Sequence, residues 1–272
     1  MQHKLFAFDL DGTLLNDRKE LSPANARALE EMAAAGGVIV FATGRLGSSI
    51  RNYIPAALDD VACLTLNGAE VCMGERHGSK RVHYAPLASA AADFLIEYSR
   101  DKPFVLNYYL DGKLYAVRND LTARWADLYF EQTGTAYQWS PSLERFRGRA
   151  PSKAIFVGAP AVIDEQEQLF RRRWGDSVYI CRTWEYYLEF LDVRANKASG
   201  LEALLEAYAV TWPEVAAFGD ANNDIPLLEK AGLGIAVANA PDEVKRAAGR
   251  VSAWTNNDDA IAREWELIKK GV

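Results

Sequence analysis

The sequence contains few of the residues that hold small or secreted proteins together. Its 272 residues include three cysteines and three histidines, and no two cysteines have the CxxC spacing. Three cysteines are too few for a disulfide framework, and the cysteines and histidines together offer few ligands for a zinc site. We therefore expect reduced thiols and a cytoplasmic location. No run approaches the roughly 18 apolar residues of a transmembrane helix, and the first residues lack the pattern of a secretory signal. We therefore expect a soluble protein without a membrane partner.

Positive charge is also in short supply. The chain has 31 Lys and Arg residues against 37 Asp and Glu residues, a formal net charge of −6. This balance argues against nucleic acid as a partner, but it permits a small anionic substrate, because a bound metal ion can reverse the local charge. The composition, with 49% hydrophobic and 25% charged residues, is typical of a globular protein. The length predicts two domains, or one domain with an insertion.

Both ends of the chain alternate between strand and helix patterns. Short apolar runs that stop at polar residues predict buried parallel strands, and the Ser22-Pro23 pair predicts the start of a helix that ends at Gly36. The predicted strands are 5–8, 38–42, 61–66, 215–218 and 235–237, and the other predicted helices are 48–57, 196–209, 223–231, 241–248 and 258–270. This alternation is typical of a parallel α/β sheet.

The middle of the chain has a different pattern. Two β-rich runs, 104–109 and 114–118, flank Asp111-Gly112, which predicts a hairpin. Further elements are predicted at 122–133 (helix), 154–157 (strand), 162–174 (helix) and 178–191 (strand pair). Five of the seven tryptophans lie between residues 125 and 212, which favours an aromatic core over an aromatic ligand site. We predict a Rossmann-like α/β parallel-sheet core from residues 1–85 and 184–272, with an inserted α+β domain at 86–183.

Three predicted strands end in polar residues suited to catalysis. They are followed by Asp9-Leu10-Asp11, by Thr43-Gly44-Arg45 and by Gly219-Asp220. Ligands of open parallel sheets bind beyond the carboxyl ends of the strands, so these residues should converge. Two carboxylates as close as Asp9 and Asp11 can have different pKa values, which suits a nucleophile beside a general acid. A lone D-x-D pattern, however, also occurs in structural turns.

Four ordered motifs resemble those of the haloacid dehalogenase superfamily. The motifs are FDLDGTL around Asp9, ATGR around Thr43, Lys197, and GDANND from Asp220 to Asp224. The length and place of the insertion are similar to those of Cof-type phosphatases, which carry a C2-type (C2B-like) cap. TLNGA at Asn67 and GLGIAVANA from Gly232 are similar to further runs of that group. The chain departs from the family at Ala221, where Gly is usual, and in the residues before Lys197.

The resemblance implies a role for each motif residue. Asp9 would be the nucleophile that forms an aspartyl-phosphate, and Asp11 would protonate the leaving group and then activate water. Thr43 and Lys197 would contact the transferred phosphoryl group. Asp11 favours phosphoryl transfer over dehalogenation, since a halide leaves without a proton whereas an alkoxide needs one. Lys153 is a poorer candidate for the catalytic lysine because it falls within the insertion.

The same resemblance implies a Mg²⁺ site. Asp9, the backbone carbonyl of Asp11 and Asp220 would be ligands, and Asp224 would be a ligand or a supporting group. Electrostatics agrees, because several carboxylates facing a dianionic ester would repel it without a divalent cation and a lysine. Oxygen ligands without sulfur or imidazole favour Mg²⁺ over zinc or copper.

Several polar residues are candidates for binding the substrate. Arg45 suits either a phosphate or a structural ion pair, and Asn67 is more typical of a turn with Gly68 than of a binding site. The full set of candidates is Thr43, Gly44, Arg45, Asn67, Lys197 and Asn223.

The resemblance thus implies a Mg²⁺-dependent phosphatase whose partner is a small phosphorylated metabolite. Sugar phosphates are the first expectation, and pyridoxal phosphate or flavin mononucleotide come next. The inserted domain would close over the core, exclude water and select the substrate. Two alternatives stay open, namely a phosphotransferase or mutase with the same intermediate, and a non-catalytic sensor of phosphate ligands. The sequence does not predict an oligomeric state.

Overall fold

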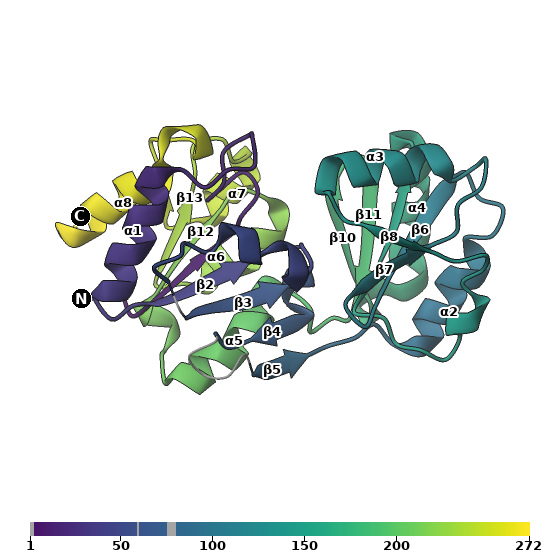
Figure 1. The fold of residues 1–272 in the computed structure, drawn as a ribbon, viewed down its shortest axis with the longest axis horizontal. Helices are drawn as coiled ribbons and strands as arrows, with labels where there is room; N and C mark the ends of the chain where they lie inside the picture. Colours follow the sequence, from purple (N-terminus) through teal and green to yellow (C-terminus); the bar gives the residue numbers. More distant parts are fainter. Residues whose placement is uncertain (1–2, 59, 75–79) are drawn as a thin grey trace. The chain divides into compact units, whose positions relative to one another are not determined.

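The computed structural model of the chain describes residues 3–58, 60–74 and 80–272. The chain divides into two compact units (Figure 1). Unit 1 comprises Met1–His83 and Asn196–Val272, and unit 2 comprises Tyr84–Ala195. The second boundary therefore lies after Ala195 rather than after residue 183, because the strand pair that precedes Ala195 belongs to the sheet of unit 2.

Unit 1 is built on an eight-stranded sheet in the order β14-β13-β12-β1-β2-β3-β4-β5. The strands from β14 to β3 are parallel, and β4 runs antiparallel to β3. Their bounds are β1 Leu5–Phe8, β2 Val38–Ala42, β3 Val61–Thr65, β4 Glu70–Cys72, β5 Arg81–Tyr84, β12 Val215–Gly219, β13 Leu233–Ala236 and β14 Arg250–Val251. Because β1 lies between β12 and β2, the residue that follows it is at the centre of the carboxyl edge.

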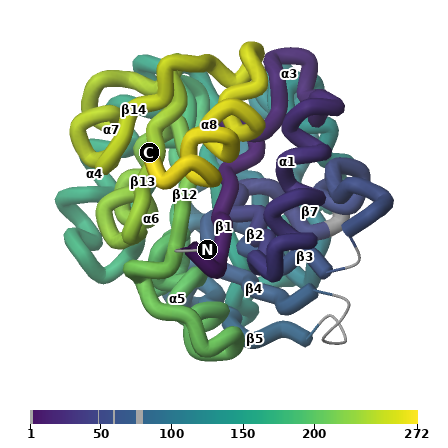
Figure 2. The backbone as a smooth tube through the Cα atoms, turned by 90° about the vertical axis from the view of Figure 1, so that its left-hand side faces the viewer, coloured from purple at the N-terminus to yellow at the C-terminus, as the bar shows by residue number. Residues whose placement is uncertain are grey.

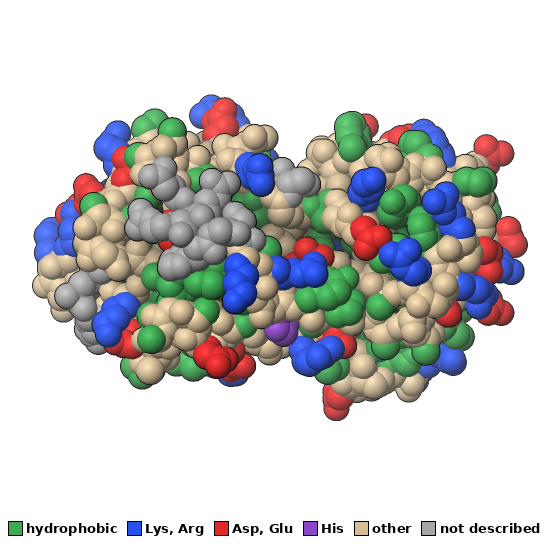
Figure 3. Space-filling model, turned by 60° about the horizontal axis from the view of Figure 1, so that its bottom comes forward, with side chains coloured by type: hydrophobic (Ala, Val, Ile, Leu, Met, Phe, Trp, Pro, Cys, Tyr) green, Lys and Arg blue, Asp and Glu red, His purple; other side chains and the backbone are tan. Residues whose placement is uncertain are grey.

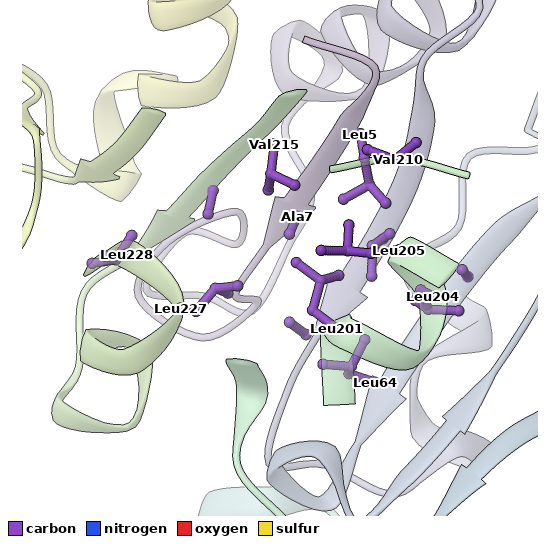
Figure 4. Close-up of a cluster of buried hydrophobic side chains, with 14 of the residues drawn as sticks. Leu5, Ala7, Leu64, Leu201, Leu204, Leu205, Val210, Val215, Leu227 and Leu228 are labelled. Carbon is purple, nitrogen blue, oxygen red and sulfur yellow. The ribbon is translucent and has the colours of Figure 1, made fainter. Parts of the chain in front are cut away.

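Helices cover both faces of this sheet. Side chains of successive β1 residues point to opposite faces, so Leu5 and Ala7 pack against the α5 side and Phe6 and Phe8 against the α1 side. Figure 2 shows α1 and α8 on one side of β1 and β12, with α5 and α6 on the other, and Figure 4 shows the leucines of α5 that pack on the sheet. The helices are α1 Pro23–Ala34, α5 Lys197–Tyr208, α6 Ile225–Lys230, α7 Asp242–Ala247 and α8 Ala260–Lys269.

One predicted element of unit 1 is wrong. Residues 48–57 were expected to form a helix, but they contain only two short 3₁₀ turns, Gly47–Ser49 and Arg51–Tyr53. Ile54 has extended backbone angles and is followed by Pro55. A residue before proline is disfavoured in the helical region, and a β-branched one adds to that preference, so the helix does not form.

Unit 2 contains a six-stranded sheet in the order β10-β11-β9-β6-β7-β8, antiparallel except for β7 with β8. Its strands are β6 Phe104–Leu110, β7 Lys113–Ala116, β8 Tyr137–Trp139, β9 Lys153–Gly158, β10 Tyr179–Trp184 and β11 Tyr187–Leu191, and its helices are α2 Ser89–Tyr98, α3 Ala123–Thr133 and α4 Pro160–Trp174. The predicted hairpin is present, since Asp111 and Gly112 both have positive φ values, as a tight two-residue turn requires.

Several aromatic residues of unit 2 pack together in its core. Phe156, Phe170 and Phe190 lie with ring centroids 4.9–5.6 Å apart, and Trp174 adds a ring 4.8 Å from Phe170. The sequence favoured such a core, but of the tryptophans on which that expectation rested, Trp139 and Trp184 are 47% and 50% exposed and Trp212 lies in unit 1. Within the described ranges, no helix is both long and apolar enough to cross a bilayer. On the face shown in Figure 3, Lys and Arg side chains lie among Asp and Glu side chains.

Candidate active site

Asp9 lies at the centre of the carboxyl edge of the unit 1 sheet. It directly follows β1, and its backbone N–H donates to the carbonyl of Phe218 in β12 at 3.0 Å. The residue is only 6% exposed. The polar segments that follow β2 and β12 end at the same edge, as the parallel pairing of these strands requires.

Lys197 joins two carboxylates at this edge. It is the first residue of α5, whose N-cap Asn196 accepts a hydrogen bond from Ser199 N. Its Nζ lies 2.5 Å from Asp9 Oδ1 and 2.5 Å from Asp224 Oδ1, and the side chain is fully buried. Burial alone would lower the pKa of Lys197, but the carboxylates of Asp224 and Asp9 outweigh burial and raise it. The lysine is therefore a permanent positive charge between two aspartates.

Asp224 supports the segment that carries Asp220. Its Oδ2 accepts the backbone N–H groups of Asp220 at 3.0 Å and of Ala221 at 2.9 Å, while its Oδ1 is bonded to Lys197. Both oxygens of Asp224 thus have partners within the chain. Ala221, which departs from the family pattern, leaves this turn intact, and Pro226 is tolerated because it lies in the first turn of α6.

Three carboxylates form a compact acidic cluster. Asp9, Asp220 and Asp224 each offer one oxygen, and these oxygens lie within 4.8 Å of one another. Burial raises the pKa of Asp9 well above its usual range, although Lys197 opposes this, and burial together with Asp224 also raises the pKa of Asp220. Buried oxygens that destabilise each other's charge are suited to hold a divalent cation, and Mg²⁺ prefers such ligands. The residues present therefore fit the metal that the motifs imply.

The loop after β1 holds Asp220 from the other side. Thr13 Oγ1 donates to Asp220 Oδ1 at 2.7 Å. Gly12 has a φ of +83°, and a Cβ added there would lie 2.4 Å from Asp220 Oδ2. Glycine is therefore required at this position both by the backbone conformation and by the approach of the Asp220 carboxylate.

Asp11 is bound by two cations. Arg45 Nε and Nη2 donate to its two carboxylate oxygens, each at 2.6 Å, and Lys19 Nζ lies 2.8 Å from Oδ1. Burial would raise the pKa of Asp11, but the hydrogen bonds and charges of Arg45 and Lys19 hold it below its usual range. Arg45 also donates to Tyr53 Oη at 2.8 Å. Of the two interpretations of Arg45, the ion pair is the one present in this structure.

The remaining candidates surround the same edge. Thr43 is buried directly after β2, and its Oγ1 accepts the N–H of Arg45 at 3.2 Å. Asn67, with a φ of 58°, forms the turn between β3 and β4, and its Oδ1 accepts from Asn223 Nδ2 at 3.0 Å. A Cβ added to Gly44 would lie 3.1 Å from Asn67 Oδ1, so these two residues are close neighbours.

Sequence reasoning thus found most residues of this edge and missed several, among them Lys19 and Tyr53. Lys19 and Tyr53 contact Asp11 and Arg45, but neither belongs to a motif, and Lys19 has a positive φ that no local signal predicted. The rival lysine, Lys153, lies in β9 of unit 2, where it pairs with Glu189. All the other predicted site residues belong to unit 1.

A sequence model of the haloacid dehalogenase-like hydrolases matches residues 6–264. The chain belongs to this family, as its motifs predicted. Its similarity to solved structures extends over both units. A crystal structure from Thermotoga maritima is 28% identical with a TM-score of 0.84, covering 97% of each chain. A haloacid dehalogenase-like hydrolase from Bacteroides thetaiotaomicron is 27% identical with a TM-score of 0.86, covering 98% of this chain and 99% of that one.

Relatives of known name are phosphatases. The 5-amino-6-(5-phospho-D-ribitylamino)uracil phosphatase of Bacillus subtilis is 28% identical over 271 residues, covering 95% of each chain. The HMP-PP phosphatase of Yersinia pestis is 25% identical over 245 residues, covering 90% of this chain and 87% of that one. The predicted class, a phosphoric monoester hydrolase of this family with an α/β fold, is confirmed.

Proposed function

We propose that the chain is a Mg²⁺-dependent phosphatase that acts on small phosphorylated metabolites through a phosphorylated Asp9. One observation carries this proposal: Lys197 bridges Asp9 and Asp224 within a buried cluster that also includes Asp220. A nucleophilic carboxylate beside a permanent cation, among metal-ligating oxygens, suits attack on a dianionic ester.

The chain's own residues would carry the reaction as follows. An oxygen of Asp9 attacks the phosphorus while the bond from phosphorus to the leaving-group oxygen breaks, and Asp11 gives that oxygen a proton. Asp11 then takes a proton from the water that attacks the aspartyl-phosphate, which releases inorganic phosphate and restores Asp9. Thr43 and Lys197 would hold the phosphoryl oxygens during both steps.

Asp9, Asp220 and the backbone carbonyl of Asp11 would hold the Mg²⁺ ion. We assign Asp224 a supporting role, because both its oxygens are already bonded to Lys197 and to two backbone N–H groups. When bound, the ion would neutralise the carboxylates and stabilise charge on the transferred phosphoryl group.

We propose that the substrates are sugar phosphates and similar small molecules that carry a phosphorylated polyol group. The name of the Bacillus subtilis relative describes a substrate with a phosphorylated ribityl chain on a uracil ring, which supports this choice. The inserted residues of unit 2 resemble a cap domain, and we therefore propose that they select the substrate.

A direct assay tests this function. Purified protein with Mg²⁺ should hydrolyse p-nitrophenyl phosphate, and EDTA should abolish the activity until Mg²⁺ is restored. Asp9→Asn should lose at least about 1,000-fold in kcat, because the amide is not a nucleophile. Near-normal turnover by Asp9→Asn would refute the covalent mechanism.

The same preparation separates the alternatives. Release of inorganic phosphate without an added acceptor supports a phosphatase, whereas turnover that requires a second substrate indicates a phosphotransferase or mutase. Binding of phosphorylated ligands without turnover would indicate a sensor. A screen of phosphorylated metabolites at constant Mg²⁺, ranked by kcat/KM, then identifies the preferred substrates.

A further inference from the structure

Three asparagine side chains hold the loop that follows β1, which we call the Asp9 loop (residues 9–15). Each donates its Nδ2 hydrogen to a different backbone carbonyl of the loop. Asn239 bonds Gly12 O at 2.8 Å, Asn25 bonds Leu14 O at 3.2 Å, and Asn256 bonds Leu15 O at 3.0 Å. The three asparagines come from α1, from the segment after β13 and from the segment before α8, so distant parts of the chain meet on this loop.

Two carbonyls of the Asp9 loop, those of Asp11 and Thr13, have no such partner within the described part of the chain. The carbonyls of Asp9 and Leu10 accept backbone N–H groups of Leu14 and Leu15. Within the described part of the chain, no hydrogen-bond donor reaches the carbonyl of Asp11. A carbonyl oxygen without a partner in the chain is available to a ligand such as a metal ion.

Asn239 is the exposed member of this group and links two of its parts. Its Oδ1 accepts the backbone N–H of Asn256 at 3.0 Å, while its Nδ2 holds Gly12. Asn239 belongs to the GLGIAVANA run, to which the proposed chemistry assigns no role. The bond to Gly12 is exposed and adds little to folding stability, so its main consequence is the position of the groups that it joins.

The position of the Gly12 peptide determines where the polar groups of its two neighbouring residues lie. On one side is Asp11, whose carbonyl is one of the two unpaired groups. On the other is Thr13, whose hydroxyl holds Asp220 Oδ1 at 2.7 Å. Gly12 has a positive φ and leaves no room for a Cβ beside the Asp220 carboxylate, so a small shift of this peptide would move both groups.

We propose that Asn239 is a positioning residue for the metal site, which acts by holding the Gly12 peptide between the Asp11 carbonyl and Thr13. This inference rests on the proposed Mg²⁺ site. Groups that orient metal ligands without touching the ion typically change metal affinity by 10- to 100-fold when they are removed. Asn239 fits that description, because it contacts neither a carboxylate of the cluster nor Lys197 in any recorded bond.

The test is Mg²⁺ binding to the substrate-free protein, measured by titration calorimetry. Asn239→Ala and the shape-matched Asn239→Leu should each weaken Mg²⁺ binding about tenfold or more, with little change in the melting temperature without metal. In the p-nitrophenyl phosphate assay, both variants should need a correspondingly higher Mg²⁺ concentration, and saturating Mg²⁺ should restore kcat. A merely structural loss would not be reversed in this way.

Asn257→Ala is the matched control. Asn257 is also exposed. Its Nδ2 donates to Asp17 Oδ2 at 2.9 Å, two residues beyond the end of the Asp9 loop, and it has no hydrogen bond to Gly12. Its Mg²⁺ affinity should equal that of the wild-type protein. The inference is overturned if both Asn239 variants stay within twofold of wild type, or if Asn257→Ala loses as much affinity as they do. Absence of Mg²⁺ binding by the wild-type protein would refute the metal site itself and this inference with it, whereas the first two outcomes leave the proposed function standing.

Discussion

Arg45 and Asp11 form a bidentate ion pair across the carboxyl edge of the unit 1 sheet. Both donor distances are 2.6 Å, and the arginine also bonds Tyr53. The pair keeps the pKa of Asp11 below its usual range in spite of burial, so the carboxylate is ionised in this arrangement. A general acid needs a proton, and both Arg45 and Lys19 oppose protonation of Asp11 in this arrangement. The dianionic phosphate of a substrate would be a competing partner for Arg45.

This relationship predicts that Arg45 and Asp11 act as one unit. Asp11→Asn and Arg45→Ala should each lower kcat/KM. The double variant should be little worse than Asp11→Asn alone, because Arg45 would act by controlling the protonation of Asp11 and has no such effect once that carboxyl is absent. Steady-state kinetics of the four proteins on one substrate measures the coupling. Losses that simply multiply would show that Arg45 acts independently of Asp11, for instance on the phosphate.

The general-acid role that we propose for Asp11 predicts that the effect of its removal depends on the leaving group. Asp11→Asn should lose about 100-fold or more in kcat on a sugar phosphate, because the departing alkoxide needs a proton. The loss on p-nitrophenyl phosphate should be much smaller, since p-nitrophenolate leaves readily without one. Rates of phosphate release for both esters, with wild type and variant side by side, make the comparison. Equal losses on the two esters would contradict the role.

Gly12 and Gly112 offer a matched pair of substitutions. Both have positive φ values, +83° and +70°, so alanine at either site should cost about 1–2 kcal/mol of stability. Only at Gly12 would the new Cβ meet a carboxylate of the acidic cluster, 2.4 Å from Asp220 Oδ2, whereas nothing lies within 4 Å of the corresponding atom at Gly112. Gly12→Ala should therefore lose Mg²⁺ binding and activity, and Gly112→Ala should keep both. Urea unfolding, calorimetry and the phosphatase assay distinguish the two effects, and an active Gly12→Ala would show that the Asp220 carboxylate can move aside.

Features that depend on short stretches of sequence, such as strand ends and motif residues, could be predicted from the sequence. Apolar runs that end in polar residues gave the bounds of β1 and β2, and the motifs brought Asp9, Lys197 and Asp220 together at one edge. The ion pair of Arg45 was one of two open interpretations, because its partner depends on how the two loops meet. The contact of Asn239 with Gly12 joins residues 227 apart, and no periodicity or spacing carries that information.

The buried ion pair of unit 2 leads to a last prediction, on stability. Lys153 and Glu189 lie on the adjacent strands β9 and β11, with their charged atoms 3.1 Å apart and side chains only 2% and 6% exposed. Glu189 also accepts a hydrogen bond from Thr183 Oγ1 at 2.9 Å. Removing one partner, as in Lys153→Met, should cost about 3–5 kcal/mol, because the remaining carboxylate would be buried without its counter-charge.

Replacing both charges should cost less than replacing one. In Lys153→Met/Glu189→Leu no buried charge is left unpaired, so the double variant should recover much of the stability that Lys153→Met loses. Urea unfolding followed by the fluorescence of the unit 2 tryptophans measures the free energies. The exposed pair of Arg118 with Asp127 is the control, and Arg118→Met should leave the stability nearly unchanged because solvent screens exposed ion pairs. A double variant that is no more stable than Lys153→Met would mean that the pair contributes through its packing and its bond to Thr183 rather than through charge compensation.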